Sequence, residues 1–178
     1  MNTESGSLND LSIRDAKTNE FEECYQLLRK FYCYDLKNST PKLMRYFEWS
    51  KNHKKVTKKI FDTYLSDDSS KIIVAINKSK VIGLGIAQIE HAEKGTRLSK
   101  IGDIHFILVD PSMRGKGISS KIKSELFKWF IKKGVFDIKL DVLISSKKNI
   151  GIYKKWGFRP YMLDMRASLK REKEKIRR

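Results

Sequence analysis

The apolar positions of this chain repeat at two spacings, and the spacings predict strands and helices in a mixed order. Apolar alternation or short apolar runs predict strands over 11–14, 71–76, 81–89, 101–109, 136–144 and 158–167. Three- and four-residue spacing predicts helices over 19–34, 118–133 and 147–156, and over a stretch from residue 40 toward residue 65, as one helix or as two divided near 51–59. Thr40-Pro41, Gly134 and Gly157 supply start and stop signals. The order β-α-α-β-β-β-α-β-α-β predicts an α/β (α+β) fold with a mixed central sheet and helices on both faces.

Length and composition favour one domain over residues 1–178, with a core over about 11–167 and a charged C-terminal tail over 168–178. No apolar run approaches the roughly 18 residues of a membrane span, and the N-terminal residues do not read as a signal peptide. We therefore expect a cytoplasmic protein without a membrane partner. Cys24 and Cys33 lie in the first helical stretch, and we expect both to be reduced and structural.

The formal net charge of +17 is unevenly distributed. Residues 1–40 hold five basic and seven acidic side chains, whereas residues 41–178 hold 33 basic and 14 acidic ones. Such a field favours anionic ligands, namely nucleotide cofactors, nucleic acid or acidic surfaces. The alternative is a solvated surface, because lysines outnumber arginines 28 to 10 and are scattered along helix faces.

A strand, a glycine loop and a helix follow one another between residues 101 and 133. The loop, Arg114-Gly115-Lys116-Gly117-Ile118-Ser119, comes directly after the apolar strand and Asp110-Pro111. Glycine lets an anion approach the backbone closely, and the N–H groups of a helix N-terminus point outward without intrahelical partners. This order therefore predicts a phosphate-binding loop.

Two motifs together resemble the GNAT superfamily of acetyl-CoA-dependent N-acetyltransferases. The loop is similar to the family's R/Q-x-x-G-x-G/A signature, with Ser119 in place of the last small residue. The second motif, 149–158, is similar to the family's short helix that ends in tyrosine and is followed by Gly-Phe, here Tyr153 and Gly157-Phe158. The resemblance covers about residues 11–167. It implies the acyl-CoA N-acyltransferase fold, acetyl-CoA as co-substrate and no metal.

The resemblance also implies which residues bind the cofactor. The amides of the loop would hold the pyrophosphate, and the pantetheine arm would lie along the end of the preceding strand. A backbone N–H there, of Leu108 or Val109, would polarise the thioester carbonyl. A further polar contact would come from Ser146 or Asn149, where many members have asparagine and alanine. The implied cofactor residues are Leu108, Val109, Arg114, Gly115, Lys116, Gly117, Ile118, Ser119, Ser146 and Asn149.

Three residues are candidates for the chemistry. Tyr153 matches the family's tyrosine, which donates a proton to the departing sulfur; the alternative is an aromatic anchor for the short helix. Asp103 and His105 are alternative general bases, beside solvent or residues outside this strand. Strand alternation predicts that both share one face with Ile107 and Val109. Asp103 matches a glutamate of the family's protein-lysine branch, and the imidazole of His105 has the better intrinsic pKa.

The acceptor is expected to be a primary amine of a small molecule or a protein. Tyr32, Tyr34 and Trp49 lie near the join of the first two helices, which often walls the acceptor site in this family; core packing is the alternative. The positive charge disfavours polycationic acceptors and favours an acceptor with acidic groups. A basic nucleic-acid-docking module and a non-catalytic acetyl-CoA-binding protein are the rival readings, with nucleic acid the weaker of them. The sequence allows a monomer or a homodimer.

Overall fold

A computed structural model describes residues 10–38, 49–92, 94–95 and 97–165, with the side chains of 33–38 excepted. One sheet has the order β1-β2-β3-β4-β5, and only β4 and β5 are parallel. Its strands are β1 (Ser12–Asp15), β2 (Ser70–Asn77), β3 (Lys80–His91), β4 (Lys100–Val109) and β5 (Ile138–Leu140). The helices are α1 (Phe21–Asn38), α2 (His53–Ser66), α3 (Ile118–Lys132) and α4 (Lys147–Lys155), with 3₁₀ turns η1 (Thr18–Glu20) and η3 (Pro111–Met113).

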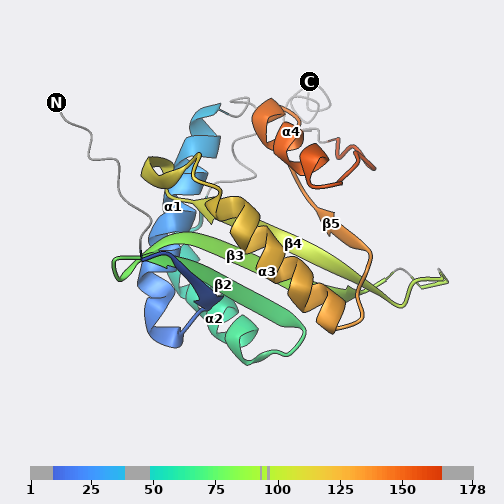
Figure 1. The fold of residues 1–178 in the computed structure, drawn as a ribbon, viewed down its shortest axis with the longest axis horizontal. Coiled ribbons are helices and arrows are strands. Elements are labelled where there is room, and N and C mark those ends of the chain that lie inside the picture. Colours follow the sequence, from blue (N-terminus) through green and yellow to red (C-terminus); the bar gives the residue numbers. More distant parts are fainter. Residues whose placement is uncertain (1–9, 39–48, 93, 96, 166–178) are drawn as a thin grey trace, which may run out of the picture.

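Helices cover both faces of the sheet, as the sequence predicts (Figure 1). Alternate residues of β2 point to opposite sides, so Ile72 and Val74 pack under α1 and α2 while Ile73 packs under α3. The α3 face is closely packed, because a Cβ built on Gly85 would lie 2.5 Å from Cγ2 of Ile122. The apolar face of α3 predicted from spacing is buried there, namely Ile118, Ile122, Leu126, Trp129 and Phe130.

Most elements fall where the apolar spacing places them, with ends shifted by one to four residues. The predicted helix start at Thr40-Pro41 lies outside the described residues, and the described helix begins at His53. Two strand predictions are wrong. Over 136–144 only Ile138–Leu140 pairs in the sheet, and the described part of 158–167 forms no strand. In both segments, apolar side chains that suggested a buried strand face solvent, including Phe136 and Tyr161.

In the part of the chain that the structure describes, no helix is long and apolar enough to cross a membrane.

Candidate active site

Strand β4 has a partner on both sides over its first half and on one side over its second half. It pairs with β3 along its length, but its parallel pairing with β5 covers only Gly102 to Ile104. Beyond Ile104, β5 diverges, as Figure 1 shows. The N–H of Asp110 donates to the Ile82 carbonyl of β3, at 2.8 Å. Because backbone groups alternate sides along a strand, the N–H of Leu108 also faces β3, and the N–H of Val109 faces the side left open by β5.

The loop after β4 is fixed at its start by Asp110. The Asp110 carboxylate accepts hydrogen bonds from the backbone N–H of Ser112 at 3.0 Å and from its hydroxyl at 2.7 Å, and so caps η3. It also forms an ion pair with Lys30 of α1, at 2.6 Å. Burial raises the pKa of this carboxyl, but the bonds from Lys30 and Ser112 outweigh it, so its pKa lies below the usual value.

The two loop glycines are required by backbone conformation. Gly115 and Gly117 have φ values of +79° and +75°, a region that L side chains rarely adopt. No heavy atom lies within 4 Å of a Cβ built on either, so the space above them is open among the described residues. Gly117 is the N-cap of α3, and the first intrahelical bond runs from the N–H of Lys121 to its carbonyl. The N–H groups of residues 118–120 therefore have no intrahelical acceptor.

The cations of the loop lie at its surface. The Arg114 side chain folds back along the loop, and its Nε donates to the Val109 carbonyl at 3.3 Å. Lys116 is half-buried, and Ile118 is a buried anchor that holds the start of α3 against the sheet. Ser119 is half-buried within the first turn of α3. The sequence-predicted loop residues are therefore all at one strand-to-helix junction.

A β-bulge in the β3–β4 ladder changes which face of the sheet the β4 side chains occupy. Ile86 pairs with Phe106 and Ala87 pairs with Ile104, which leaves His105 as the extra residue. Before the bulge, Ile104 packs under α3. After it, Ile107 and Val109 pack there instead. The prediction that Asp103 and His105 share a face with Ile107 and Val109 is therefore wrong, because simple alternation ignores the extra residue.

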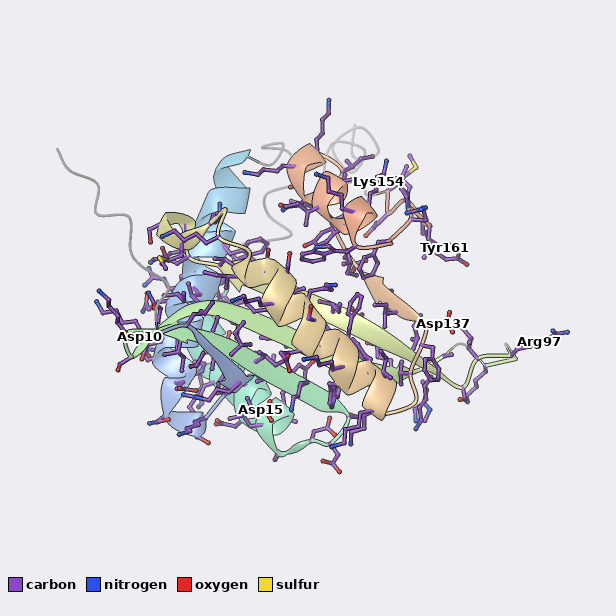
Figure 2. The ribbon with its side chains drawn as sticks, viewed as in Figure 1. Asp10, Asp15, Arg97, Asp137, Lys154 and Tyr161 are labelled. Atoms are coloured by element: carbon purple, nitrogen blue, oxygen red, sulfur yellow. The ribbon has the colours of Figure 1, made fainter. Side chains whose placement is uncertain are left out.

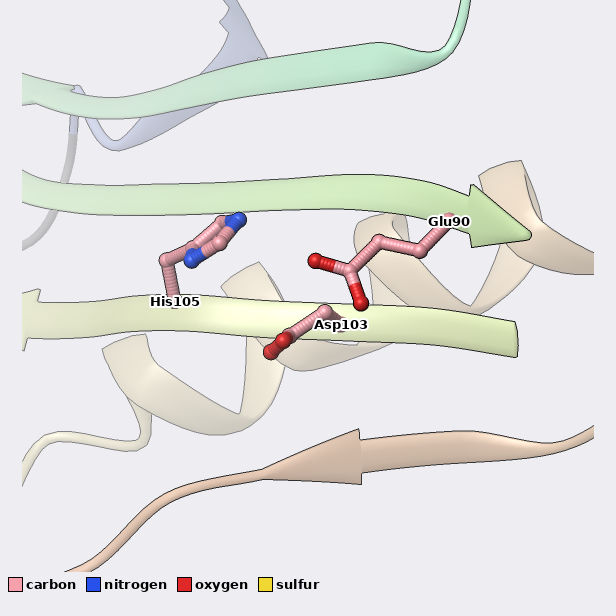
Figure 3. A group of neighbouring side chains, drawn as sticks. All are labelled: Glu90, Asp103 and His105. Atoms are coloured by element: carbon pink, nitrogen blue, oxygen red, sulfur yellow. The ribbon is translucent and has the colours of Figure 1, made fainter. Parts of the chain in front are cut away.

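Asp103 and His105 lie in a polar cluster on the α2 side of the sheet. Figure 3 shows Glu90 of β3 directed toward these two β4 side chains, and one ligand-type atom of each lies within 4.8 Å of the others. Lys139 of β5 forms ion pairs with Glu90 at 2.8 Å and with Asp103 at 3.1 Å. The Glu90 hydrogen bond, followed by that of Asp103, outweighs burial and raises the pKa of Lys139. The cation that two adjacent carboxylates require is therefore supplied by the chain itself.

Within the described residues, Nε2 of His105 is shielded from solvent and has no hydrogen-bond partner. A buried polar atom of this kind is costly unless a ligand or water completes it. The ring centroid of His105 lies 6.0 Å from that of Tyr64 of α2, whose hydroxyl donates to Gln88 at 3.1 Å. Burial, and then the charges of Glu90, Asp103 and Asp67, raise the pKa of Tyr64.

Sequence reasoning missed Glu90, Lys139, Tyr64 and Gln88. Lys139 and Asp103 are register partners in β5 and β4, and Gln88 is the partner of Asp103 in β3. The signal was a set of polar residues in three otherwise apolar strands, and only the register shows that they meet.

Tyr153 lies on α4, beyond the edge where β5 diverges. Its ring packs on Trp156 at 5.5 Å and on Phe158 at 6.2 Å between centroids. Phe158 in turn contacts Phe127 of α3 at 6.3 Å, so the C-terminal end of α4 is attached to the helix that follows the glycine loop. Ser146 is the N-cap residue of α4 and Asn149 lies in its first turn, both half-buried.

The aromatic residues near the first two helices form a cluster above β4. The Tyr32 ring lies 4.7 Å from Trp49 and 6.3 Å from Phe106, which follows the bulge residue His105. Trp49 also packs on His53, 4.2 Å between centroids. Tyr32 and Trp49 thus take part in packing on the same face as the polar cluster, whereas the Tyr34 side chain lies outside the described residues.

Comparison with known proteins gives a consistent family and several relatives. The sequence model of the acetyltransferase (GNAT) family matches residues 21–158. A curated relative, glucosamine 6-phosphate N-acetyltransferase of Trypanosoma brucei brucei, is 34% identical over 87 residues, which are 48% of this chain and 57% of the relative. The match thus spans little more than half the length of that protein.

Two solved structures are similar in fold. A predicted acetyltransferase with acetyl-CoA from Clostridium acetobutylicum has a TM-score of 0.70 at 18% identity, covering 89% of this chain and 96% of that chain. Glucosamine-6-phosphate N-acetyltransferase from Arabidopsis thaliana has a TM-score of 0.64 at 18% identity, covering 90% and 99%.

Proposed function

The chain belongs to the acetyltransferase (GNAT) family, and we propose that it transfers the acetyl group of acetyl-CoA directly to the amine of a small phosphorylated acceptor. The reaction is one attack within a ternary complex. The observation that carries the proposal is the junction of an open strand edge with a left-handed glycine loop at a helix N-terminus.

The described residues fit a diphosphate at the loop. The space above Gly115 and Gly117 is open, and the N–H groups of residues 118–120 lack intrahelical acceptors. A single helix dipole contributes about 0.3–1 kcal/mol, so several N–H donors must share the task. Arg114 and Lys116 add positive charge at the same place. We assign the amides of residues 114–119 to diphosphate binding.

The open edge of β4 fits an extended chain such as the pantetheine arm. Bound acetyl-CoA supplies a thioester carbonyl and a thiolate leaving group. Of the two candidate donors we favour Val109, because its N–H faces the open side whereas the N–H of Leu108 faces β3. A fixed N–H that points at a developing oxyanion stabilises it without reorganisation. Ser146 and Asn149 remain candidates for the polar contact to the arm.

We assign the general base to His105, with Asp103 as the alternative. An alkylammonium has a pKa of about 10.4 and must lose a proton before it attacks. Nε2 of His105 is shielded and without a partner among the described residues, so it can accept this proton directly or through one water. Asp103 already accepts the Lys139 ammonium. Tyr153 donates its phenolic proton to the departing sulfur.

The aromatic cluster supplies the acceptor wall. Tyr32 and Trp49 lie on the face of the sheet that carries His105, and Phe106 joins them to β4. A phosphorylated acceptor suits the net charge of +17, because opposite charge speeds its approach. The name of the Trypanosoma relative specifies such an acceptor, glucosamine 6-phosphate. A cytoplasmic location belongs to the proposal.

Release of free thiol from acetyl-CoA over a set of amines tests the proposal. We expect kcat/KM for glucosamine 6-phosphate to exceed that for glucosamine at least about tenfold, about 1.4 kcal/mol. A preference for peptide amines would refute the small-molecule acceptor. Calorimetric binding of acetyl-CoA without turnover would indicate a non-catalytic binding protein. Salt-sensitive binding to nucleic acid with no affinity for acetyl-CoA would indicate a docking module.

Three variants test the roles within the site. Tyr153→Phe is expected to slow transfer with little change in acetyl-CoA affinity. His105→Gln is expected to remove the acidic limb of the pH–rate profile, whereas Asp103→Asn is expected to retain it. If Asp103→Asn alone removes that limb, Asp103 is the base. Full rates in all three variants would contradict every role assigned here.

A further inference from the structure

The segment after α4 is strongly exposed although its side chains are large and apolar. Tyr161, Met162, Leu163 and Met165 expose 96%, 86%, 60% and 84% of their surface. Scattered apolar residues at a surface are ordinary, but four within five positions are not. Their pattern is the one that predicts a strand over 158–167, and no strand forms there among the described residues.

An unpaired strand edge lies in the same part of the molecule. β5 is the last strand of the sheet and pairs with β4 alone. Phe136, two residues before it, exposes 76% of its surface. Figure 2 shows Asp137, at the start of β5, and Tyr161 on the same side of the molecule. An exposed edge with free N–H and C=O groups is a template for another extended chain.

The charge distribution favours a second copy of this chain as the occupant. The chain carries 38 lysines and arginines, yet residues 161–165 contain none and one aspartate. Residues 136–146 contain two aspartates and one lysine, Lys139, whose ammonium is held by Glu90 and Asp103. Both segments therefore lack the positive charge that elsewhere repels a second copy. An anionic partner such as nucleic acid or a lipid surface would find little attraction here.

We propose that this protein forms a homodimer in which residues 158–165 of each copy add as a strand to the β5 edge of the other. The main-chain hydrogen bonds of the added strand and the burial of its apolar side chains stabilise the pair. The exchange is reciprocal, as a two-fold dimer requires. A standard interface buries about 800 Å² per partner. Phe136 and Tyr161 alone can supply roughly 300–500 Å² of it, because aromatic side chains bury about 150–250 Å² each.

Analytical ultracentrifugation of the full chain over a range of concentrations tests the dimer. We expect a mass twice that of the 20.8 kDa chain at high concentration. The double variant Tyr161→Asp/Leu163→Asp is expected to weaken the dimer at least about tenfold. Val56→Asp is the matched control, because Val56 lies on α2 with 53% of its surface exposed. The control is expected to leave the dimer unchanged.

Hydrogen exchange on the unmodified chain separates strand addition from other contacts and does not depend on a variant folding. The amides of 138–144 and 159–165 are expected to gain protection as concentration rises. A monomer at every concentration, or protection of both segments that is independent of concentration, would overturn the proposal; the latter would mean that the segment pairs with its own β5. A dimer that survives the double variant, or that Val56→Asp dissociates equally, would also overturn it.

Discussion

Removing the Asp110 carboxylate should loosen the glycine loop at its first residue. In Asp110→Ala the cap of η3 and the ion pair with Lys30 are both lost. In Asp110→Asn a side-chain oxygen still accepts from the Ser112 N–H, but the charge is gone. The two substitutions therefore divide the effect of Asp110 into capping and charge.

The magnitudes follow from the contacts. Loss of an N-cap acceptor costs about 1 kcal/mol. The Lys30 ion pair adds about 0.2–1 kcal/mol, because the lysine side chain is 56% exposed. Asp110→Ala should thus lower the free energy of unfolding by about 1.5 kcal/mol and Tm by about 3–6 °C for a chain of this size. Asp110→Asn should cost about half as much.

Thermal unfolding monitored by circular dichroism measures both variants, with Lys30→Met completing a double-mutant cycle. The folded-state pKa of Asp110 is depressed, so its contribution is present above the unfolded carboxyl pKa of about 3.9 and is lost as pH falls through the lower folded value. The difference between wild type and Asp110→Asn should therefore shrink in acid. A wild-type Tm for Asp110→Ala, or a difference that persists undiminished in acid, would refute the reasoning.

Three further predictions concern single residues. Gly117→Ala should destabilise the chain by about 1–2 kcal/mol through its φ of +75° and weaken acetyl-CoA binding, measured by chemical denaturation and calorimetry. Gly151→Ala, inside α4 with open space around its Cβ, should instead stabilise it by about 0.5–1 kcal/mol, and equal signs for the two would contradict the backbone argument. Burial raises the pKa of the Cys24 thiol to about 12, so Cys24→Ala should leave the native titre of a thiol reagent unchanged; a lower titre would show that Cys24 is accessible.

The sequence carried the elements that local patterns determine. The spacing of Ile118, Ile122 and Leu126 determines the buried face of α3, and Gly115 and Gly117 mark the loop because few other residues adopt their backbone conformation. The elements that depend on partners were harder to predict. The extra residue at His105 follows from the β3–β4 pairing, and the polar cluster around Lys139 follows from the register of three strands.

The two failed strand predictions have one physical cause. Apolar alternation indicates that side chains will be buried, but not by which part of the molecule or by which copy of it. Phe136 and Tyr161 fulfil the pattern and remain exposed in a single chain. The same reasoning explains why η3 was missed, since its cap by Asp110 depends on one local hydrogen-bond pattern rather than on apolar spacing.

The crystal structure of a complex with coenzyme A is the most direct test of the account. We expect its diphosphate to accept hydrogen bonds from the main-chain N–H groups of residues 114–119, with the arm extended along β4 beside Val109. A diphosphate held by lysine side chains elsewhere, or an arm on the β3 side of β4, would contradict the central claim.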